Sequence, residues 1–443
     1  MRSVRWFVNV LVVAVLVLAG SSPSWAIPAF ARKYRTSCQT CHIAFPALTP
    51  FGEAFRLNGY RFPEGSDATM SKDQPVELGA EGYKKLWPRS VWPGELPGSV
   101  PLSLVVESEI ANDRATKTTS FDGLGGVAAF LAAGTLGEHA SFWSEAEFHR
   151  EDGEITTEME RVNAQFRPFS SPILQIKVGS FEPGLTLVSG HRTLSNYGYL
   201  MTEEPVGDNQ WAAEPFQQGI EFYGVAAHRI LYNAGYVEGA GNAPNNTKDV
   251  YGRVAYKFGG LAFDGSTKGD ASALTANPKP WSEKSITVSI FGYKGSPLLS
   301  ETTTTLMNDP NTNIVSEVES TTSQNDPFTV YGGDVRWNFM DLIVRAGMSD
   351  RTDRRPFLSD PTMTDIKTQN RFGEIDWVAY PWLVPAARWE KFKVGEANME
   401  KLSLTLQMLI RANVRGYLAF DKVKEPGDKY RTEEIVAGLA YGM

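Results

Sequence analysis

Two cysteines and one histidine form the motif with the clearest chemical use in this chain. The sequence of 443 residues contains two cysteines, and both lie in the segment Cys38-Gln39-Thr40-Cys41-His42. In a CxxCH motif, two thioether bonds hold the edge of a porphyrin, and the adjacent imidazole binds the iron as its proximal ligand. The motif therefore predicts one covalent c-type haem, attached to Cys38 and Cys41 and bound at the iron by His42.

The same three side chains have two other possible uses. A redox-active CxxC needs a thioredoxin-like βαβ setting, and no such pattern surrounds this pair. A structural zinc site needs four ligands, whereas residues 27–75 contain no cysteine or histidine besides these three. Both alternatives are therefore weaker than haem.

A short helix is predicted directly after the motif. Thr49-Pro50 is typical of an N-cap followed by proline at the first helical position, and Asn58-Gly59 is typical of a helix end. Phe51 and Phe55 fall on one face of this helix. In a segment this small a haem would form much of the core, and that face could cover the macrocycle.

The sixth ligand of the iron is less clearly marked. Met70 is the one methionine of residues 27–75, and its thioether as distal ligand would raise the haem potential. The alternative is a solvated methionine in a Ser/Asp-rich loop. Two single histidines of the later region, His149 and His191, remain further candidates.

The N-terminal residues have the pattern of a secretory signal peptide. Arg2 and Arg5 precede an apolar run from Trp6 to Gly20, and Ser24-Trp25-Ala26 follows. This order predicts a signal peptide over residues 1–26. The alternative is an uncleaved membrane anchor, for which the run is short, since a spanning helix needs ~20 apolar residues.

Composition and charge exclude several classes of protein. Hydrophobic residues make up 42% and aromatic residues 12% of the chain, which excludes a disordered or collagen-like polymer. Acidic residues outnumber basic ones by 51 to 43, and no basic tract occurs, so we expect no nucleic-acid partner. Two neighbouring cysteines also exclude a disulfide-stapled fold.

From about residue 101 onward, apolar and polar side chains alternate with a period of two. Between Leu402 and Ile410, for example, apolar residues alternate with Ser403, Thr405 and Gln407. Strands of a soluble sandwich are shorter, whereas a transmembrane strand needs ~9–11 residues, apolar toward lipid and polar toward the lumen. We therefore predict a mainly β fold, an antiparallel transmembrane β-barrel of about sixteen strands with a small N-terminal α-helical haem domain.

The expected organisation follows from these patterns. It comprises a signal peptide (1–26), a monohaem cytochrome c head (27–75), a linker (76–100) and an outer-membrane, porin-like β-barrel (101–443). The strands are expected near residues 100–111, 124–134, 139–150, 157–167, 172–181, 218–226, 228–239, 249–259, 283–295, 328–340, 341–350, 369–379, 383–394, 398–410, 412–422 and 431–443.

The lengths of the connections support the barrel independently. Every second connection is short, such as Gly134–His139, whereas long ones, such as Glu182–Gln217 and Gly295–Pro327, fall mostly on the other parity. Short turns of outer-membrane barrels face the periplasm, so we expect both termini there. The long connection Gly259–Glu283 breaks the pattern, either as a periplasmic excursion or because a strand is missed or wrongly assigned there.

Three smaller expectations complete the barrel. The Ser/Thr-rich segment Glu301–Asp326 is expected to be a solvated loop. Tryptophans near strand ends are expected in interfacial girdles: Trp281, Trp337, Trp377, Trp382 and Trp389. Charged residues on the polar strand faces are expected in the lumen, paired with one another and with the head, or else lining a water-filled channel: Glu145, Glu147, Arg161, Arg253, Asp334, Arg336, Arg345 and Arg388.

The head resembles a known family over about 35 residues. The similar segments are Ile27–Arg32, Cys38–His42, Phe45–Gly52 with Phe55, and Asn58–Tyr60. Together they resemble the fused monohaem cytochrome–porins of the bacterial outer membrane, whose best-known members are iron oxidases. The sequence departs from the usual barrel ending, because Met443 stands where outer-membrane barrels often have an aromatic residue.

The resemblance implies a haem at the barrel entrance that takes electrons from extracellular Fe(II) and passes them to a periplasmic c-type cytochrome or other carrier. It implies residence in outer-membrane lipid, electron transfer with Fe(II) oxidase activity, and haem packing by Phe30, Arg32, Phe51 and Phe55. Similar heads also occur in bacteria that reduce extracellular metals, so the opposite direction of electron flow is an alternative. Two further alternatives are a solute porin with a haem-containing gate or sensor, and an exported soluble β-rich cytochrome.

Overall fold

The structure is a computed structural model of the chain. It describes residues 29–63, 67–77, 81–86, 95–114, 116–151, 154–194, 198–239, 247–267, 275–308, 315–360, 362–425 and 431–442. The predicted signal peptide and the terminal Met443 lie outside these residues.

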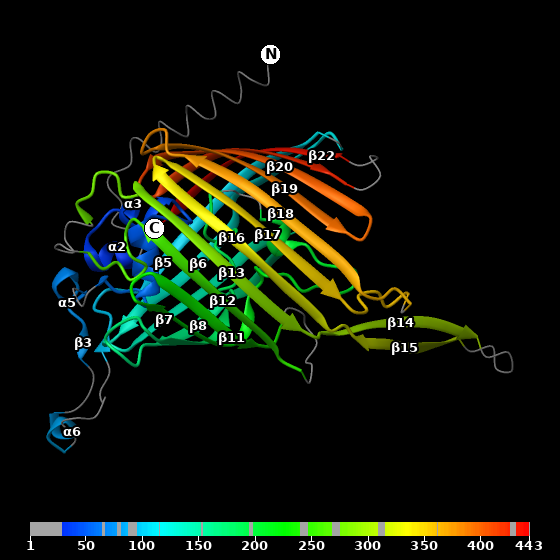
Figure 1. Ribbon diagram of the computed structural model, residues 1–443, viewed down its shortest axis with the longest axis horizontal. Coiled ribbons are helices and arrows are strands. Elements are labelled where there is room, and N and C mark those ends of the chain that lie inside the picture. The colour runs from blue at the N-terminus through cyan, green and yellow to red at the C-terminus, as the bar shows by residue number, and fades with distance from the viewer. Residues whose placement is uncertain are drawn as a thin grey trace, which may run out of the picture.

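Sixteen of the described strands form one closed antiparallel barrel (Figure 1). Each strand pairs with its neighbours in chain order, except that β13 pairs directly with β16, and β22 closes the barrel on β5. The predicted fold class is confirmed. The barrel strands are β5 Leu102–Asp113, β6 Thr118–Leu136, β7 Ala140–Glu151, β8 Glu154–Phe166, β9 Gln175–Phe181, β10 Gln217–Ala226, β11 Ile230–Val237, β12 Asp249–Gly259, β13 Glu283–Gly295, β16 Phe328–Met340, β17 Leu342–Asp353, β18 Ile366–Trp377, β19 Leu383–Val394, β20 Ala397–Arg411, β21 Val414–Lys424 and β22 Arg431–Gly442.

The alternation places apolar side chains on the outside of the barrel and polar ones on the inside. On β13, Ile286, Val288 and Ile290 are exposed, whereas Thr287 and Ser289 are buried. An apolar outer face on a closed sheet, with every strand edge paired, is the arrangement that surrounding hydrocarbon requires. Among the described residues, no helix is long and apolar enough to cross a membrane.

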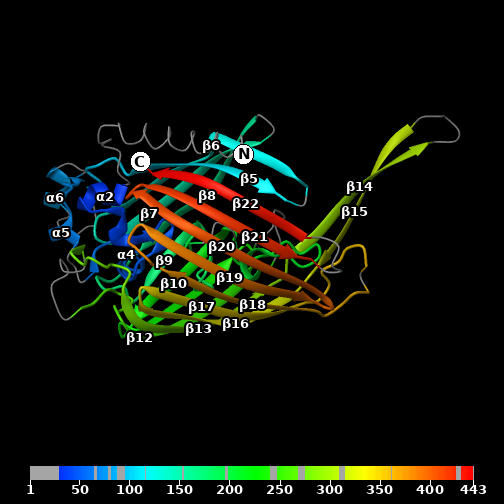
Figure 2. The ribbon, with the colours of Figure 1, turned by 90° about the horizontal axis from the view of Figure 1, so that it is seen from above.

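The segment Glu301–Asp326 corrects one expectation. It contains most of a two-stranded hairpin, β14 Leu298–Asn308 and β15 Val315–Asn325, rather than an irregular solvated loop. Its threonines are β-branched and favour extended backbone, which outweighs the loop-like polarity of the sequence. The hairpin projects from the barrel mouth opposite the head (Figure 2). The connection Gly259–Glu283 is resolved as an excursion, because β12 pairs directly with β13.

Trp281 corrects a second expectation. It is buried, and its Nε1 donates a hydrogen bond to Asp341 Oδ1 at 2.9 Å, so it anchors a turn instead of facing an interface. The other four predicted interfacial tryptophans are exposed on the barrel surface, as expected: Trp337, Trp377, Trp382 and Trp389.

The head precedes the barrel and contains the predicted helix. Thr49 caps helix α4, Pro50–Leu57: its hydroxyl accepts a hydrogen bond from Gly52 N at 3.1 Å. Gly59 follows with a φ of +67°, a left-handed conformation that glycine adopts readily. The remaining elements before the barrel are α2 Ala29–Tyr34, α3 Cys38–Cys41, β1 His42–Ala44, β2 Ala47–Leu48, α5 Asp67–Met70, β3 Val76–Glu77, α6 Glu81–Leu86 and β4 Glu95–Leu96.

The head lies at the barrel mouth that the short turns form (Figures 1 and 2). Asn58 Nδ2 donates to Asp264 O at 2.9 Å, and Arg61 Nη2 donates to Ala140 O at 2.6 Å. Arg415 on β21 donates in turn to Phe45 O at 2.6 Å. The small helical domain is therefore held by several turns around the rim.

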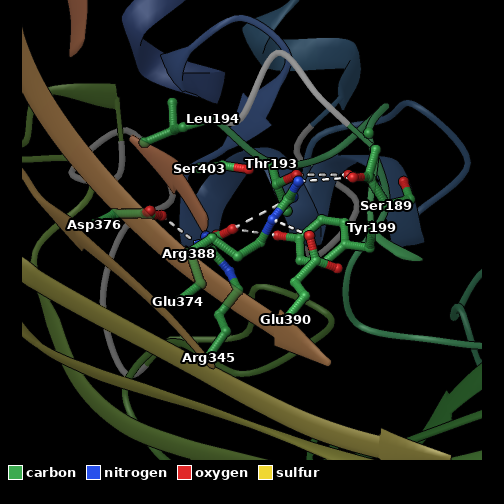
Figure 3. Close-up of polar contacts among 12 residues, drawn as sticks. Ser189, Thr193, Leu194, Tyr199, Arg345, Glu374, Asp376, Arg388, Glu390 and Ser403 are labelled. Carbon is green, nitrogen blue, oxygen red and sulfur yellow. Dashed lines mark hydrogen bonds and ion pairs between the residues drawn. The ribbon is translucent and has the colours of Figure 1, made fainter. Parts of the chain in front are cut away.

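The long connection between β9 and β10 folds into the lumen. We call its described part, within residues 182–216, the lumen loop; it includes helix α7, Leu200–Glu203. Its apolar residues form a buried core with inward-facing aromatic residues of the wall. Polar contacts with the barrel wall also hold the lumen loop in place, as Figure 3 shows around Tyr199 and Arg388. The core residues are Leu185, Val188, Tyr199, Met201, Trp211 and Ala213 from the loop, and Phe181, Val237, Tyr251, Phe291, Tyr293, Phe328, Val330 and Phe372 from the wall.

Candidate haem-attachment site

The three side chains of the CxxCH motif border one cavity. Helix α3 separates Cys38 from Cys41 by one turn, and Ser37 caps this helix by accepting a hydrogen bond from Gln39 N at 3.3 Å. Cys38, Cys41 and His42 all face a cavity of about 490 Å³ that lies between the head and the inner wall of the barrel. This volume is in the range of cofactor-sized pockets.

Helix α4 supports the motif from behind. Thr49 N donates to Cys41 O at 2.9 Å, and the hydroxyl of Thr49 donates to Thr40 O at 2.8 Å. A Cβ atom added at Gly52 would lie 2.0 Å from Cys41 O, so only glycine permits this approach. Gly52 was not predicted, although a glycine in the first turn of a helix that follows CxxCH indicates close packing of two backbones.

The environment of His42 suits a proximal ligand. Its Nδ1 lies 3.2 Å from Pro46 O, a contact in which Nδ1 carries the proton and Nε2 keeps a free lone pair for a metal. Separation from bulk water lowers the pKa of His42 to about 4, so the ring is neutral at pH 7. The donor set and the neighbouring cavity therefore fit an attached haem.

The cysteine thiols do not resemble a thiol–disulfide redox pair. Burial raises the pKa of Cys38, and it raises the pKa of Cys41 to about 12. A redox CxxC instead has a thiol whose pKa is lowered, because the thiolate is the reacting species. The alternative of a redox-active cysteine pair is thus not favoured.

Three of the four predicted haem-packing residues lie at the cavity, and one does not. Phe30, Phe51 and Phe55 line it, and the rings of Phe30 and Phe55 meet edge-to-face at 5.2 Å. Arg32 is not among the lining residues; its guanidinium donates to Val100 O at 2.8 Å and to Leu102 O, at the start of the barrel. Arg32 therefore joins the head to the barrel.

Of the three candidate distal ligands, the structure places one at the cavity and two outside it. Met70 packs against the aromatic cluster of the head and is not among the residues that line the cavity. His191, on the lumen loop, does line the cavity, with Nδ1 3.4 Å from Glu182 and 3.5 Å from Glu214. His149 lies outside the lining, and its Nε2 is 3.2 Å from Glu147. The structure therefore brings His191, and not Met70, to the same cavity as His42.

The barrel supplies the far side of the cavity with charged and aromatic side chains. Trp143 stacks near Tyr60 of the head at 5.3 Å, and Arg161 lies 5.1 Å from the Trp143 ring. Most of the predicted lumen charges pair, for example Arg161 with Glu145 in the wall and Arg336 with Glu53 of the head. Arg253 and Asp334 form hydrogen bonds to the backbone of the lumen loop instead. No group of three or more His, Cys, Asp or Glu in the described part of the chain is placed to hold a free metal ion.

Comparison with known proteins shows the fold of the barrel. No protein-family model and no curated protein match the chain. An anion-selective porin from Comamonas acidovorans is similar in structure, with a TM-score of 0.51 and 11% identity over 78% of this chain and 99% of the porin. A loop L8 deletion mutant of OmpT, an outer membrane protein of Vibrio cholerae, has a TM-score of 0.49 and 10% identity, covering 79% and 99% of the two chains. At this identity the likeness to the porin establishes a shared fold.

Proposed function

We propose that this chain is an electron-transfer protein of the bacterial outer membrane that carries one covalent haem. Cys38 and Cys41 attach the haem, and His42 binds its iron. The observation that carries the proposal is the cavity itself: all three CxxCH side chains border it, and the barrel wall encloses its far side. A haem there would be held at the entrance of a membrane-spanning cylinder.

The proposed location rests on the outer surface of the barrel and on the signal peptide. The exposed apolar positions of the strands suit lipid, and export followed by barrel insertion leads to the outer membrane. The head sits at the mouth of short turns, which is the periplasmic mouth in such barrels, and both chain ends belong to that side. The β14–β15 hairpin then projects to the cell exterior.

The residues around the cavity have separate tasks in this function. A bound haem supplies reversible one-electron chemistry. His42 holds a neutral imidazole at the iron, while Phe30, Phe51 and Phe55 exclude water from the cavity. Gly52 and Thr49 keep α3 pressed against α4, so the two attachment points and the ligand stay in one orientation.

We propose that extracellular Fe(II) is the electron donor and that a periplasmic c-type cytochrome or other carrier is the acceptor. This direction follows from the resemblance of the head to the iron-oxidising cytochrome–porins. Outer-sphere transfer of an electron to the haem needs no coordinating site for the iron. Reduction of extracellular metal is the same chemistry run in reverse.

The interior of the barrel favours electron transfer over solute transport. The lumen loop packs a continuous apolar core against the wall, including Tyr199, Trp211 and Phe328. Such a core narrows the lumen at that level, which supports the electron conduit over a wide, water-filled channel. The head also lies across the barrel mouth that the short turns form.

The test is spectroscopy of the purified outer-membrane protein. Haem staining after denaturing electrophoresis detects the covalent attachment, and stopped-flow mixing with Fe(II) then records reduction of the oxidised haem. We expect a stained band and a reduced spectrum after mixing. An unstained band would show that no haem is attached. If the haem stays oxidised with Fe(II), but its reduced form is oxidised by ferric iron, the proposed direction of electron flow is reversed.

A further inference from the structure

The wall of the cavity carries more positive than negative side chains. Its lining includes six lysine and arginine residues. Four of them form ion pairs with carboxylates that line the same cavity, which leaves two. The pairs are Arg161–Glu145, Lys177–Glu221, Arg192–Glu182 and Arg415–Glu107.

Arg56 and Arg253 are the two cavity-lining cations without such a carboxylate. Arg56 lies on helix α4 of the head, and its Nε is buried without a hydrogen-bond partner. Arg253 lies on β12 of the barrel and is 5% exposed. Its Nη1 donates to Thr186 O at 3.1 Å, but its Nε and Nη2 have no acceptor. Among the described residues, neither guanidinium forms an ion pair.

The two carboxylates that act electrostatically on Arg253 form hydrogen bonds or ion pairs with other groups. Arg253 is affected by the negative charges of Asp334 and Glu53. Asp334, however, accepts hydrogen bonds from Leu187 N at 2.8 Å and from the hydroxyl of Ser289. Glu53 is paired with Arg336. Neither carboxylate completes the hydrogen bonding of Arg253.

The positive charges of Arg56 and Arg253 also repel each other. A buried charge without a partner is strongly unfavourable, and two like charges that face one cavity increase the effect. An anion in the cavity would supply the missing acceptors. Guanidinium groups bind carboxylates particularly well, because their N–H donors match both carboxylate oxygens.

We propose that Arg56 and Arg253 bind the propionate carboxylates of the haem attached to Cys38 and Cys41. This inference rests on the proposed function, and it adds the orientation of the group. Cys38 and Cys41 on α3 would hold the thioether edge of the porphyrin, and Arg56 and Arg253 would hold its propionates. Because Arg56 belongs to the head and Arg253 to the barrel, the haem then bridges the two parts of the molecule.

The experiment measures the midpoint potential of the full-length haem protein as a function of pH. In the wild type both propionates stay ionised beside the arginines, so they add no pH dependence near neutrality and their contribution to the profile is flat. Any slope from His191 and Glu147, which line the same cavity, is common to the wild type and the arginine variants. In Arg56→Gln/Arg253→Gln, a propionate enclosed without its cations takes up a proton more readily. We expect the potential of this variant to fall as pH rises through neutrality, because the ionised propionate stabilises ferric iron.

A matched control removes a charge pair from the same cavity. Glu145→Gln/Arg161→Gln neutralises a cation together with the carboxylate that it is paired with. For this variant we expect the potential to depend on pH as in the wild type. The single variants Arg56→Gln and Arg253→Gln are expected to give smaller slopes, and Arg253→Lys, which retains the charge, restores most of the flat profile. If the haem-loaded double variant keeps the wild-type profile, or if the control acquires the same slope, the propionate assignment is wrong. A wild-type protein without covalent haem instead contradicts the proposed function.

Discussion

The carboxylate of Glu53, on helix α4 of the head, forms an ion pair with the guanidinium of Arg336, on strand β16 of the barrel. The two residues are 283 positions apart in the sequence. Their side chains are only 12% and 14% exposed, so the pair is largely removed from water. The head is therefore held by a specific buried charge pair as well as by the hydrogen bonds around the rim.

The substitution Glu53→Gln should weaken the attachment of the head. It leaves Arg336 buried without its counter-charge, a change that costs about 3–5 kcal/mol in comparable pairs. Limited proteolysis of the folded protein should then release the head faster. The exposed pair of Lys391 and Glu400 offers a control, because Glu400→Gln should change stability by ~0–1 kcal/mol. Equal release rates for both variants would contradict a structural role for the buried pair.

The same pair predicts a dependence on acidity. Burial alone would raise the pKa of Glu53, but the charges of Arg336 and Lys257 outweigh it and lower the pKa to about 2. Since the folded-state pKa is depressed, the stabilisation is complete above the ordinary value of 4.5 and is lost as pH falls toward 2. The thermal stability of the head, measured from pH 6 to about pH 2, should therefore fall further in the wild type than in Glu53→Gln.

Replacement of His42 by alanine should change the haem spectrum without removing the pigment. The thioether bonds to Cys38 and Cys41 remain, but the iron loses its proximal ligand. We expect a haem-stained band together with loss of the wild-type reduced spectrum. The exposed His139 supplies the control, since it is not among the residues that line the cavity, and His139→Ala should keep the spectrum. A wild-type spectrum in His42→Ala would show that another residue binds the iron.

The contact between Gly52 and Cys41 can be tested by adding one methyl group. In Gly52→Ala the new Cβ meets the backbone of Cys41, which must shift, and overpacking of this kind costs about 1–3 kcal/mol. Haem content per polypeptide and the melting temperature should both fall. Gly82→Ala is the matched control in another helix, because a Cβ there meets nothing within 4 Å.

Ion conductance separates the electron conduit from the solute porin. The intact protein should conduct weakly in planar bilayers, because the head lies over one mouth of the barrel and the lumen loop narrows its interior. Replacing residues 185–213 by a short linker should raise the conductance, even with the head in place, more than removing the head alone. Porin-like conductance of the intact protein would instead support the haem-gated solute channel.

The barrel strands were predictable because each one has lipid on one face and the lumen on the other, so apolar and polar side chains alternate along it. Fifteen of the sixteen barrel strands lie within three residues of the expected ranges, and β12, β13, β16 and β19 have the predicted bounds. Strand β6 begins six residues before its expected start. The β14–β15 hairpin was missed because it projects from the barrel and both of its faces meet water, so its apolar and polar residues do not alternate. Trp281 was misplaced because its partner Asp341 comes from another turn.

That Phe51 and Phe55 lie close to the CxxCH side chains was predictable for a similar reason, since all of them belong to one short segment. The rest of the cavity depends on closure of the barrel. His191 and Arg253 approach the head only after the lumen loop and β12 have folded around it, and no local pattern marks them. The placement of Met70 and Arg32 outside the lining likewise depends on how the head sits on the rim.

Closure of the barrel by β22 against β5 also sets an order in time for biogenesis. Cys38 and Cys41 are synthesised early, whereas the chamber they face does not exist until Arg431–Gly442 has paired with Leu102–Asp113. On the proposed function, a haem-attaching enzyme would reach the two half-buried cysteines most easily before the barrel wall has formed around the cavity that they face. The polypeptide would then acquire its pigment as a periplasmic intermediate, before membrane insertion.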